Sequence, residues 1–580
     1  MAAAIRGRCV SPADRGCVAL NALGLRVPFR YPAFEWSRAP GGLVLGNTTL
    51  ALLGGVYLTL IGSPAFWRET FASAQFTGWA GAWTAIALLV ALVTVNILMT
   101  SLLLHGRAAR VTLAMLMMVT AASSYFSWKY TVYIDDDMLR NVLHTDMAES
   151  RELLQPSLWA FVAVFGGIPS GLLLWVRPKT QSMRRACLHR IVQSAVALVV
   201  LLAALGSAFQ PIAGLMHAHR DLRHLVAPAN VLVSLVRVAT HTSRIRGHGT
   251  VVGADAHPAA RIAARKPRVL ILVVGETVRA GNWGLNGYRR QTTPRLAAIN
   301  PINYPTVTAC GSSTEVSLPC MFAPVGRRRY ERDRIEQSES VLHVLERAGI
   351  ATVWRDNQSG CKGVCTGLAF ESFRNAEAEG ACDGEACLDS ILLRGLTQLI
   401  HADEGDRVVV LHQLGSHGPG YHRRYPRSLE RFQPTCSTDE LADCTRESIV
   451  NAYDNSILMT DAFVASVIAE ARRLQDRDTA VLYVSDHGES LGENGLYLHG
   501  VPYAVAPREQ TRVPMILWLS TGFARSRGID MACMRRRAAG PISHDHLFHT
   551  VLGLMDVQTR ALEPVYNLVA VCSTPVETGP

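Results

Sequence analysis

Five long apolar stretches that lack Asp, Glu, Lys and Arg occupy most of the chain between residues 43 and 209. They are Leu43–Trp67, Trp79–Leu104, Val111–Trp128, Leu158–Val176 and Ile191–Phe209. At about 1.5 Å per helical residue, each is long enough to cross a hydrocarbon core of about 30 Å. Buried helices of a soluble domain are the alternative, but a succession of five uncharged runs argues against them. The sequence therefore predicts five membrane-spanning helices.

Charges in the loops between these stretches predict the orientation of the chain. Arginine and lysine gather before the first stretch, between the second and third, and between the fourth and fifth, whereas the loop 129–156 is acidic. Positive loops favour the cytoplasmic side. The N-terminus is therefore expected in the cytoplasm and, after an odd number of spans, everything beyond about residue 212 on the other side. Much of the net charge of +10 lies in these loops, so we expect no binding to nucleic acid.

At 580 residues the chain is too long for a single core. We expect a disordered cytoplasmic leader, a five-span domain, a bridging helix or linker, and an outer domain, over residues 1–38, 39–212, 213–266 and 267–580. The outer domain alternates between β-branched runs and helical patterns. Strands are expected at 268–274, 350–354, 407–412, 479–485 and 513–519, and helices near 339–348, 389–401, 447–474 and 544–554. This alternation predicts an α/β domain with a mostly parallel sheet covered on both faces.

Cysteines are concentrated in the outer domain, where ten of the 13 follow residue 300. Eight of them form close pairs along the chain: Cys310 and Cys320, Cys361 and Cys365, Cys382 and Cys387, and Cys436 and Cys444. In a non-cytoplasmic domain such clusters favour local disulfides over zinc–thiolate sites, which would need two pairs brought together. The sequence does not decide whether Cys533 pairs with Cys572. Cys9, Cys17 and Cys187 are expected to be free.

Metal ligands follow two of the predicted strands. Glu276 comes just after the run Val269–Val274, and Asp486 and His487 come directly after Val481–Ser485. Ligands of open α/β sheets bind at the carboxyl edge of the strands. Carboxylates and an imidazole at that edge predict a metal site.

A candidate nucleophile lies between Cys310 and Cys320. Ser312 and Glu315 have the spacing of a capping box, so a helix is expected to begin here. Thr314 would lie in its first turn, where free N–H groups favour a phosphate. An ordinary capped helix is the alternative. Because Glu276, Asp486 and His487 are available as metal ligands, we favour a metal-activated threonine nucleophile.

Four further residues suit a phosphate site. His417 and His499 are each followed by glycine and follow strands that carry other site residues, and Ser359 and Lys362 share the segment Asn-Gln-Ser-Gly-Cys-Lys. A lone histidine is more often structural, and the chain has 19. His417 and His499 are selected from these because each is next to a glycine and follows a strand that carries other candidate site residues.

In the acidic loop 129–156, Asn141, Thr145 and Glu149 are spaced i, i+4, i+8, which predicts a common helical face. It is either a solvated face or a recognition surface for a cationic headgroup, with Glu149 facing the amine.

Together these motifs resemble the lipid A phosphoethanolamine transferase family, which includes the mobile colistin-resistance enzymes. The resemblance covers nearly all of the chain beyond about residue 38. It implies a multi-pass α-helical domain in the bacterial inner membrane and a periplasmic α/β domain of the alkaline phosphatase/sulfatase type. The substrates that it implies are phosphatidylethanolamine as donor and lipid A, within lipopolysaccharide, as acceptor. The modification would lower the binding of cationic peptides such as polymyxin. We expect a monomer.

The resemblance also implies roles for the candidate residues. Zn²⁺ would be bound by Glu276, Thr314, Asp486 and His487, and Thr314 would carry the phosphoethanolamine covalently. The phosphate would be handled by Ser359, Lys362, His417 and His499. The headgroup of the donor would be recognised by Asn141, Thr145 and Glu149.

Other functions fit the sequence less well. A lipoteichoic-acid-type synthase shares the five spans and the threonine but transfers glycerol phosphate, and the paired cysteines and Glu149 argue against it. A sulfatase needs a Cys/Ser-x-Pro/Ala-x-Arg motif, which Cys320-Met-Phe-Ala-Pro does not match. A transporter would tend to place ionisable residues inside its spans. Open alternatives are transfer to Kdo or heptose of the core, and transfer to the 1- or the 4′-phosphate of lipid A.

Overall fold

The computed structural model describes residues 44–574, apart from 72–75, 145–146, 180–181, 243–248, 260–264, 374–375, 377–381 and 383–386. The expected leader 1–38, with Cys9 and Cys17, lies outside the described residues, so these expectations stay predictions. Cys187 is free and exposed.

The N-terminal part is helical and apolar. Within the described residues, four helical segments are long and apolar enough to span a membrane: α3 (Gly78–Leu103), α4 (Ala109–Tyr130), the run Pro156–Trp175 and Arg184–Ser207 of α9 (Met183–Ser207). A fifth candidate is the pair α1 (Asn47–Gly62) and α2 (Pro64–Phe71), which is bent by 55°. The bend falls at Pro64, which lacks the N–H that a continuous helix needs. Four straight candidates and one bent one agree with the five predicted stretches.

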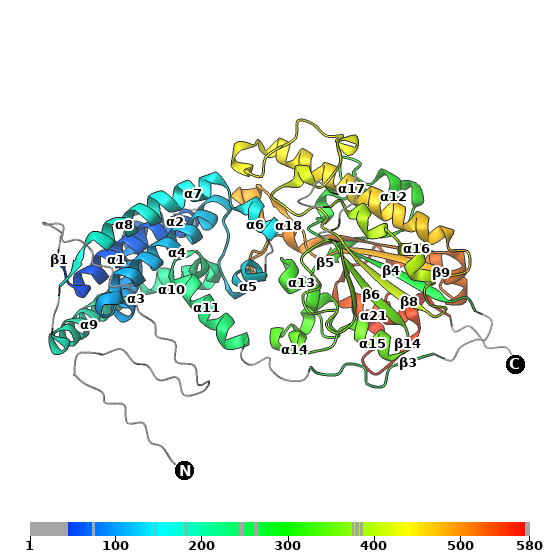
Figure 1. Ribbon diagram of the computed structural model, residues 1–580, viewed down its shortest axis with the longest axis horizontal. Helices are drawn as coiled ribbons and strands as arrows, with labels where there is room; N and C mark the ends of the chain where they lie inside the picture. The colour runs from blue at the N-terminus through cyan, green and yellow to red at the C-terminus, as the bar shows by residue number, and fades with distance from the viewer. Residues whose placement is uncertain are drawn as a thin grey trace, which may run out of the picture. The chain divides into compact units, whose positions relative to one another are not determined.

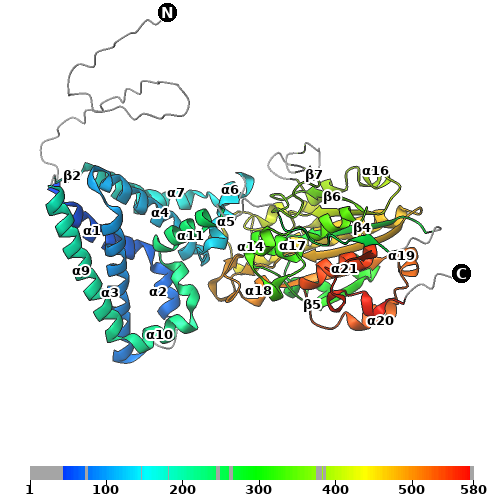
Figure 2. The same ribbon diagram turned by 90° about the horizontal axis from the view of Figure 1, so that it is seen from below.

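These helices pack against one another as a bundle. α1 contacts α3 and α4, α3 contacts α9, and α4 contacts α8 (Ile168–Trp175), which follows α7 (Pro156–Val162) through the π-helical turn Ala163–Gly167. Figure 2 shows α3 and α9 side by side. Many large apolar side chains of α9 are exposed, as expected of a lipid-facing helix. Shorter helices lie along the chain on either side of the last two spans: α5 (Asp136–His144), α6 (Met147–Leu153), α10 (Phe209–Ala218) and α11 (Ala229–Thr242).

The C-terminal part is built on a mixed sheet that has eight strands within the described residues. Their order is β13-β5-β12-β9-β4-β8-β6-β7. In chain order they are β4 (Arg268–Gly275), β5 (Ile302–Thr308), β6 (Ala351–Asp356), β7 (Ala369–Ser372), β8 (Arg407–His412), β9 (Asp478–Ser485), β12 (Arg512–Leu519) and β13 (Ile542–Ser543). The five predicted strands are present. β12 runs antiparallel to both of its neighbours, and the other pairs are parallel.

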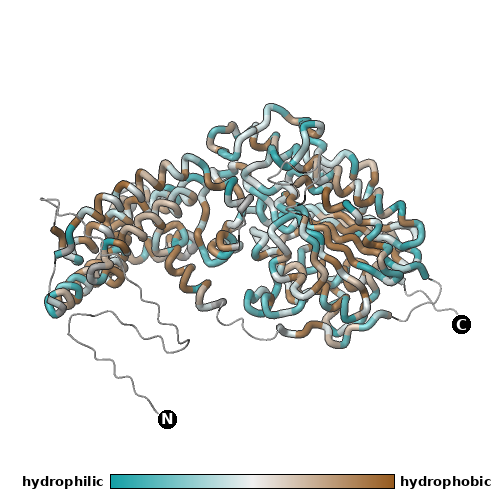
Figure 3. The backbone as a smooth tube through the Cα atoms, in the orientation of Figure 1, coloured by the Kyte–Doolittle hydropathy of each residue, from teal (hydrophilic) through white to brown (hydrophobic). Residues whose placement is uncertain are grey.

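Helices cover both faces of the sheet. α12 (Pro294–Ile299), α16 (Leu396–His401) and α17 (Arg446–Arg473) lie above it in Figure 1, and α15 (Val341–Arg347) and α21 (Asp545–Met555) lie below. Alternate residues of β4 enter the two cores: Leu270, Leu272 and Val274 on one face, and Val269, Ile271 and Val273 on the other. The strands are the hydrophobic centre of the domain in Figure 3. A fully buried parallel strand is apolar on both faces, which explains its continuous apolar sequence.

Five disulfides are present among the described residues. They join the four expected pairs and also Cys533 to Cys572, across 39 residues of chain. Three short strand pairs lie outside the main sheet: β1 (Val44–Leu45) with β2 (Arg177–Pro178), β3 (His257–Pro258) with β14 (Val557–Gln558), and β10 (Ser490–Leu491) with β11 (Tyr497–Leu498).

Loop length predicts which disulfide matters most for stability. The Cys533–Cys572 bridge spans 39 residues and the Cys436–Cys444 bridge eight. Loop-closure entropy then assigns them about 4 and about 2.5 kcal/mol. Replacing both cysteines of the longer bridge by alanine should lower the midpoint of thermal unfolding more than the matched double replacement in the shorter one. Scanning fluorimetry of the full chain in detergent measures both, and a larger loss from the shorter bridge would contradict the argument.

Candidate metal and nucleophile site

Three buried side chains meet where β4 and β9 end. β4 ends at Gly275 and is followed by Glu276, and β9 ends at Ser485 and is followed by Asp486 and His487. The strands are parallel, with Gly275 opposite Ser485, so the three residues emerge side by side. Each is 0% exposed. One ligand atom from each lies within 4.8 Å of the others, which is the arrangement of a metal site.

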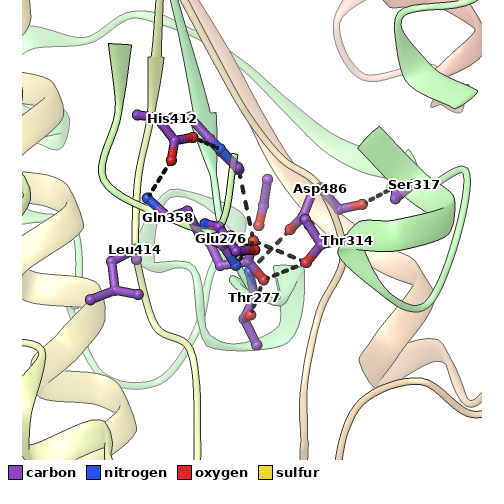
Figure 4. A network of polar contacts seen from close by, with 12 residues as sticks. Glu276, Thr277, Thr314, Ser317, Gln358, His412, Leu414 and Asp486 are labelled. Atoms are coloured by element: carbon purple, nitrogen blue, oxygen red, sulfur yellow. Dashed lines mark hydrogen bonds and ion pairs between the residues drawn. The ribbon is translucent and has the colours of Figure 1, made fainter. Parts of the chain in front are cut away.

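Thr314 completes this cluster. Its Oγ1 lies 3.0 and 3.1 Å from the two carboxylate oxygens of Glu276 and 3.2 Å from Nε2 of His487. Figure 4 shows the hydroxyl pointing at Glu276 from the start of α13 (Thr314–Met321). Because Thr314 is the first residue of that helix, its hydroxyl lies where the helix leaves N–H groups unpaired.

The expected capping box is wrong, although a helix does begin here. Ser313, not Ser312, precedes the first helical residue, and no side chain caps the helix. The Ser312 hydroxyl instead donates to the carbonyl of Val501 at 2.6 Å. Another hydrogen bond joins the first turn of the helix to the segment after β9: the hydroxyl of Ser317 donates to the carbonyl of Asp486 at 2.5 Å.

Local hydrogen bonds hold the cluster residues in place. The backbone N–H of Thr277 donates to Oδ1 of Asp486 at 3.1 Å, and the hydroxyl of Thr277 donates to Oε1 of Glu276 at 2.7 Å. Nδ1 of His487 donates to the carbonyl of Gly488 at 2.9 Å, which turns Nε2 toward the carboxylates. A second partner that fixes the ring is typical of metal-binding histidines.

The buried acidic and basic groups of the cluster shift one another's pKa values. Burial and the nearby charge of Glu276 raise the pKa of Asp486 to about 7. Burial opposes ionisation of Glu276, but the hydrogen bond and charge of His487 outweigh it and lower the pKa of that carboxyl. Burial likewise opposes protonation of His487, but the two carboxylates raise its pKa to about 10. Oδ2 of Asp486 is buried and accepts no hydrogen bond from the described residues. A divalent cation bound by these groups would add positive charge beside the two carboxylates.

Two residues that our sequence reasoning did not select lie behind Glu276. His412 ends β8, is fully buried, and has Nδ1 2.8 Å from Oδ1 of Asp356 and Nε2 4.0 Å from Oε2 of Glu276. Gln358 donates to the same Glu276 oxygen at 3.4 Å (Figure 4). The sequence did contain a signal for His412 and its partner Asp356. These residues end the strands β8 and β6, so they lie at the same edge of the sheet as Glu276.

The expected phosphate residues fall into two groups. The ring of His499 lies 4.4 Å from that of His487 and 5.2 Å from that of His417, between centroids. Ser359 and Lys362 line a separate cavity of about 760 Å³ that also includes Glu315, the neighbour of Thr314. Asn141 belongs to α5. Thr145 and the side chain of Glu149 lie outside the described residues, so the common helical face stays a prediction.

Comparison with known proteins covers both parts of the chain. Residues 92–243 match the family described as phosphoethanolamine transferase EptA/EptB, and residues 268–557 match the sulfatase family. The chain is 35% identical over 529 residues to phosphoethanolamine transferase EptA of Escherichia coli (strain K12), covering 90% of this chain and 96% of that one. The chain belongs to the EptA phosphoethanolamine transferase family.

Further members of the EptA family agree in sequence and structure. Phosphatidylethanolamine transferase Mcr-1 of Escherichia coli is 36% identical over 485 residues, which cover 81% of this chain and 88% of that one. The integral membrane protein lipooligosaccharide phosphoethanolamine transferase A (EptA) from Neisseria meningitidis superposes with a TM-score of 0.89 at 35% identity, covering 92% of this chain and 100% of that one. The chain is thus a phosphoethanolamine transferase and an integral membrane protein with multiple spans, with a sulfatase-type α/β domain.

A glycine beside the cluster offers a steric test of this geometry. A Cβ added at Gly488 would lie 2.1 Å from the carbonyl oxygen of Glu509 and 3.0 Å from Cβ of Arg279. Gly488→Ala should therefore displace the neighbouring His487, and transferase activity should fall at least about tenfold, with overpacking costing about 1–3 kcal/mol of stability. Gly405→Ala is the control, because no heavy atom lies within 4 Å of the added Cβ. Comparable activity in the two variants would count against the close packing around His487.

Proposed function

We propose that this enzyme transfers phosphoethanolamine from phosphatidylethanolamine to a phosphate of lipid A through a covalent intermediate on Thr314. The observation that carries the proposal is the buried hydroxyl of Thr314, 3.0 Å from Glu276 and 3.2 Å from His487. A threonine so placed beside carboxylates and an imidazole suits nucleophilic attack on phosphorus. The family to which the chain belongs supports phosphoethanolamine as the transferred group.

The donor set fits Zn²⁺. Two carboxylates, one imidazole and one hydroxyl give four N and O ligands, the number that zinc prefers, and the buried Oδ2 of Asp486 accepts no hydrogen bond from the described residues. Glu276, Asp486, His487 and Thr314 would hold the ion. When bound, zinc would lower the pKa of the Thr314 hydroxyl and neutralise charge on the phosphoryl oxygens.

The residues divide the reaction into two displacements. In the first, Oγ1 of Thr314 forms a bond to the phosphorus of the donor, the bond from phosphorus to the diacylglycerol oxygen breaks, and that oxygen takes up a proton. In the second, an oxygen of the acceptor phosphate attacks the same phosphorus, and Thr314 is released and regains its proton. Burial lowers the pKa of His499, so its imidazole is neutral near pH 7 and able to accept and return a proton.

Other residues would orient the two substrates. Ser359 and Lys362 would contact phosphate oxygens from the cavity next to Glu315, and His417 would do so beside His499. Asn141, Thr145 and Glu149 would recognise the donor's ethanolamine group. The reaction would take place on the periplasmic side of the bacterial inner membrane, with the enzyme as a monomer. Adding an amine to lipid A would reduce its negative charge and hence the binding of cationic peptides.

The sequence identities argue against the sugars of the core as acceptor. The chain is 26% identical to the Kdo(2)-lipid A phosphoethanolamine 7''-transferase of Escherichia coli (strain K12), against 35% for EptA of the same strain. Mass spectrometry of lipid A from cells that express the enzyme tests the acceptor directly.

Replacing the nucleophile should abolish transfer and leave the fold intact. Thr314→Ala deletes one hydroxyl at a helix start and no part of the hydrophobic core, whereas Thr314→Ser keeps a nucleophilic oxygen and should retain partial activity. Intact-mass analysis after incubation with phosphatidylethanolamine alone should detect the phosphoethanolamine adduct in wild type and not in Thr314→Ala. Near-normal turnover of Thr314→Ala would exclude the covalent route.

Removing a ligand should remove the metal. Asp486→Asn and His487→Gln should each lower bound zinc at least about tenfold, since every ligand contributes to a four-coordinate site. Asp476→Asn, whose side chain is 56% exposed, serves as a control that removes a carboxylate elsewhere. Elemental analysis of the purified full chain gives the readout. Full zinc occupancy in both ligand variants would show that the ligand set is wrong.

A further inference from the structure

A second cavity, lined by arginines, lies beside the loop that follows β4. Its volume is about 1090 Å³. Among its lining residues are six arginines and two glutamates: Arg279, Arg289, Arg290, Arg446, Arg508, Arg512, Glu447 and Glu509. These residues come from separate parts of the chain, so the concentration of positive charge arises only in the folded domain.

Carboxylates around the cavity balance only part of this charge. Glu493 is shared by Arg279 and Arg446, at 2.8 and 3.1 Å, and Asp454 lies 3.0 Å from Arg290. With these two acids added to the two glutamates of the lining, six guanidinium groups face four carboxylates. Gathering like charges around one cavity costs electrostatic free energy unless an anion enters it. Guanidinium groups match the geometry of phosphate oxygens especially well.

The cavity combines fixed and exposed arginines. Arg279 is 9% exposed, donates to Oδ1 of Asn282 at 2.6 Å and to the carbonyl of Glu489 at 3.2 Å, and so forms a rigid inner wall. At the rim, the side chains of Arg446 and Arg508 are 56% and 86% exposed. A rigid wall with adjustable cations at the entrance suits a ligand that arrives from outside.

The inner wall is also the back of the metal cluster. Arg279 follows Glu276 by three residues, and its N–H donates to the hydroxyl of Tyr453, which donates in turn to the carbonyl of Thr277. On the other side, Gly488 packs so closely against Arg279 and Glu509 that no Cβ fits there. Gly488, the neighbour of His487, therefore packs directly against two residues that line the arginine cavity.

We propose that this cavity binds a second anionic group, a phosphate monoester, of the glycolipid acceptor while another phosphate of the same molecule reacts at Thr314. The inference rests on the proposed function and names the part of the acceptor that the enzyme recognises apart from the reacting phosphate. The donor suits the cavity less well, because a zwitterionic headgroup carries no net charge to offset the excess of guanidinium groups. The cavity thereby selects acceptors with more than one phosphate.

Two exposed arginines allow a test that spares the catalytic cluster. The cavity variant is Arg289→Gln/Arg508→Gln. The control is Arg473→Gln/Arg560→Gln, which also removes two positive charges. The control side chains are 73% and 96% exposed and do not line the cavity. Steady-state kinetics of the full chain in detergent micelles use bisphosphorylated and monophosphorylated lipid A as acceptors. The KM for the bisphosphorylated acceptor should rise roughly fivefold in the cavity variant alone, as expected for two exposed charge contacts. The kcat, the Thr314 adduct formed from donor alone, and the KM for the monophosphorylated acceptor should stay within about twofold.

Three outcomes would overturn the proposal. Equal KM values for bisphosphorylated lipid A in the cavity and control variants would show that the cavity does not contact the acceptor. A similar rise in KM for both acceptors would show that the cavity does not recognise the second phosphate of the acceptor. If wild type forms the Thr314 adduct but modifies neither the bisphosphorylated nor the monophosphorylated lipid A, lipid A is not the acceptor. The proposed function and this inference would then both be wrong. The first two outcomes leave the proposed function intact.

Discussion

The parallel pairing of β4 with β9 is the constraint on which the rest of the site depends. Because Gly275 lies opposite Ser485, the residues that follow the two strands emerge together, and Glu276 meets Asp486 and His487. All eight residues of each strand are buried. If the pairing of β4 with β9 shifted by one residue, the side chains of β4 would point into the opposite core and Glu276 would move away from Asp486 and His487. The same strand register therefore specifies both the core packing and the geometry of the cluster.

The position of the cluster has an electrostatic consequence. Two carboxylates with 0% exposure repel each other, and the repulsion is reduced only in part by His487 and by the hydrogen bonds from Thr277. Such a group is unfavourable as an element of stability alone. A cation bound between the two carboxylates would reduce their repulsion, so the binding free energy of the ion would offset the cost of burying them.

The candidate functional residues lie in separate places around this centre. Thr314 and the candidate metal ligands occupy the carboxyl edge of the sheet, Ser359 and Lys362 line one cavity, and arginines from several segments line another. The pair His412 and Asp356 lies behind Glu276, fully enclosed by protein. Two separate cavities near Thr314 suit the proposed reaction, in which one group is transferred between two large amphiphilic molecules.

Much of this organisation could be predicted from the sequence, because local patterns report local burial. Uncharged apolar runs identified the candidate spans, and β-branched runs identified β4, β6, β8, β9 and β12. The acids and the histidine after two of those strands were expected at one edge of the sheet, and Glu276, Asp486 and His487 do meet there. Close pairs of cysteines predicted four disulfides, which are present. The tertiary structure alone decided what depends on distant segments: the reversed direction of β12, the place of β5 with its internal Pro305, and the bridge from Cys533 to Cys572. It also decided the contact of His412 with Glu276, the bond from Ser312 to Val501 that replaced the expected cap, and the gathering of arginines from several segments around one cavity. The physical reason is that periodicity along a chain records which face of an element is buried, whereas pairing between elements depends on contacts that no local pattern encodes.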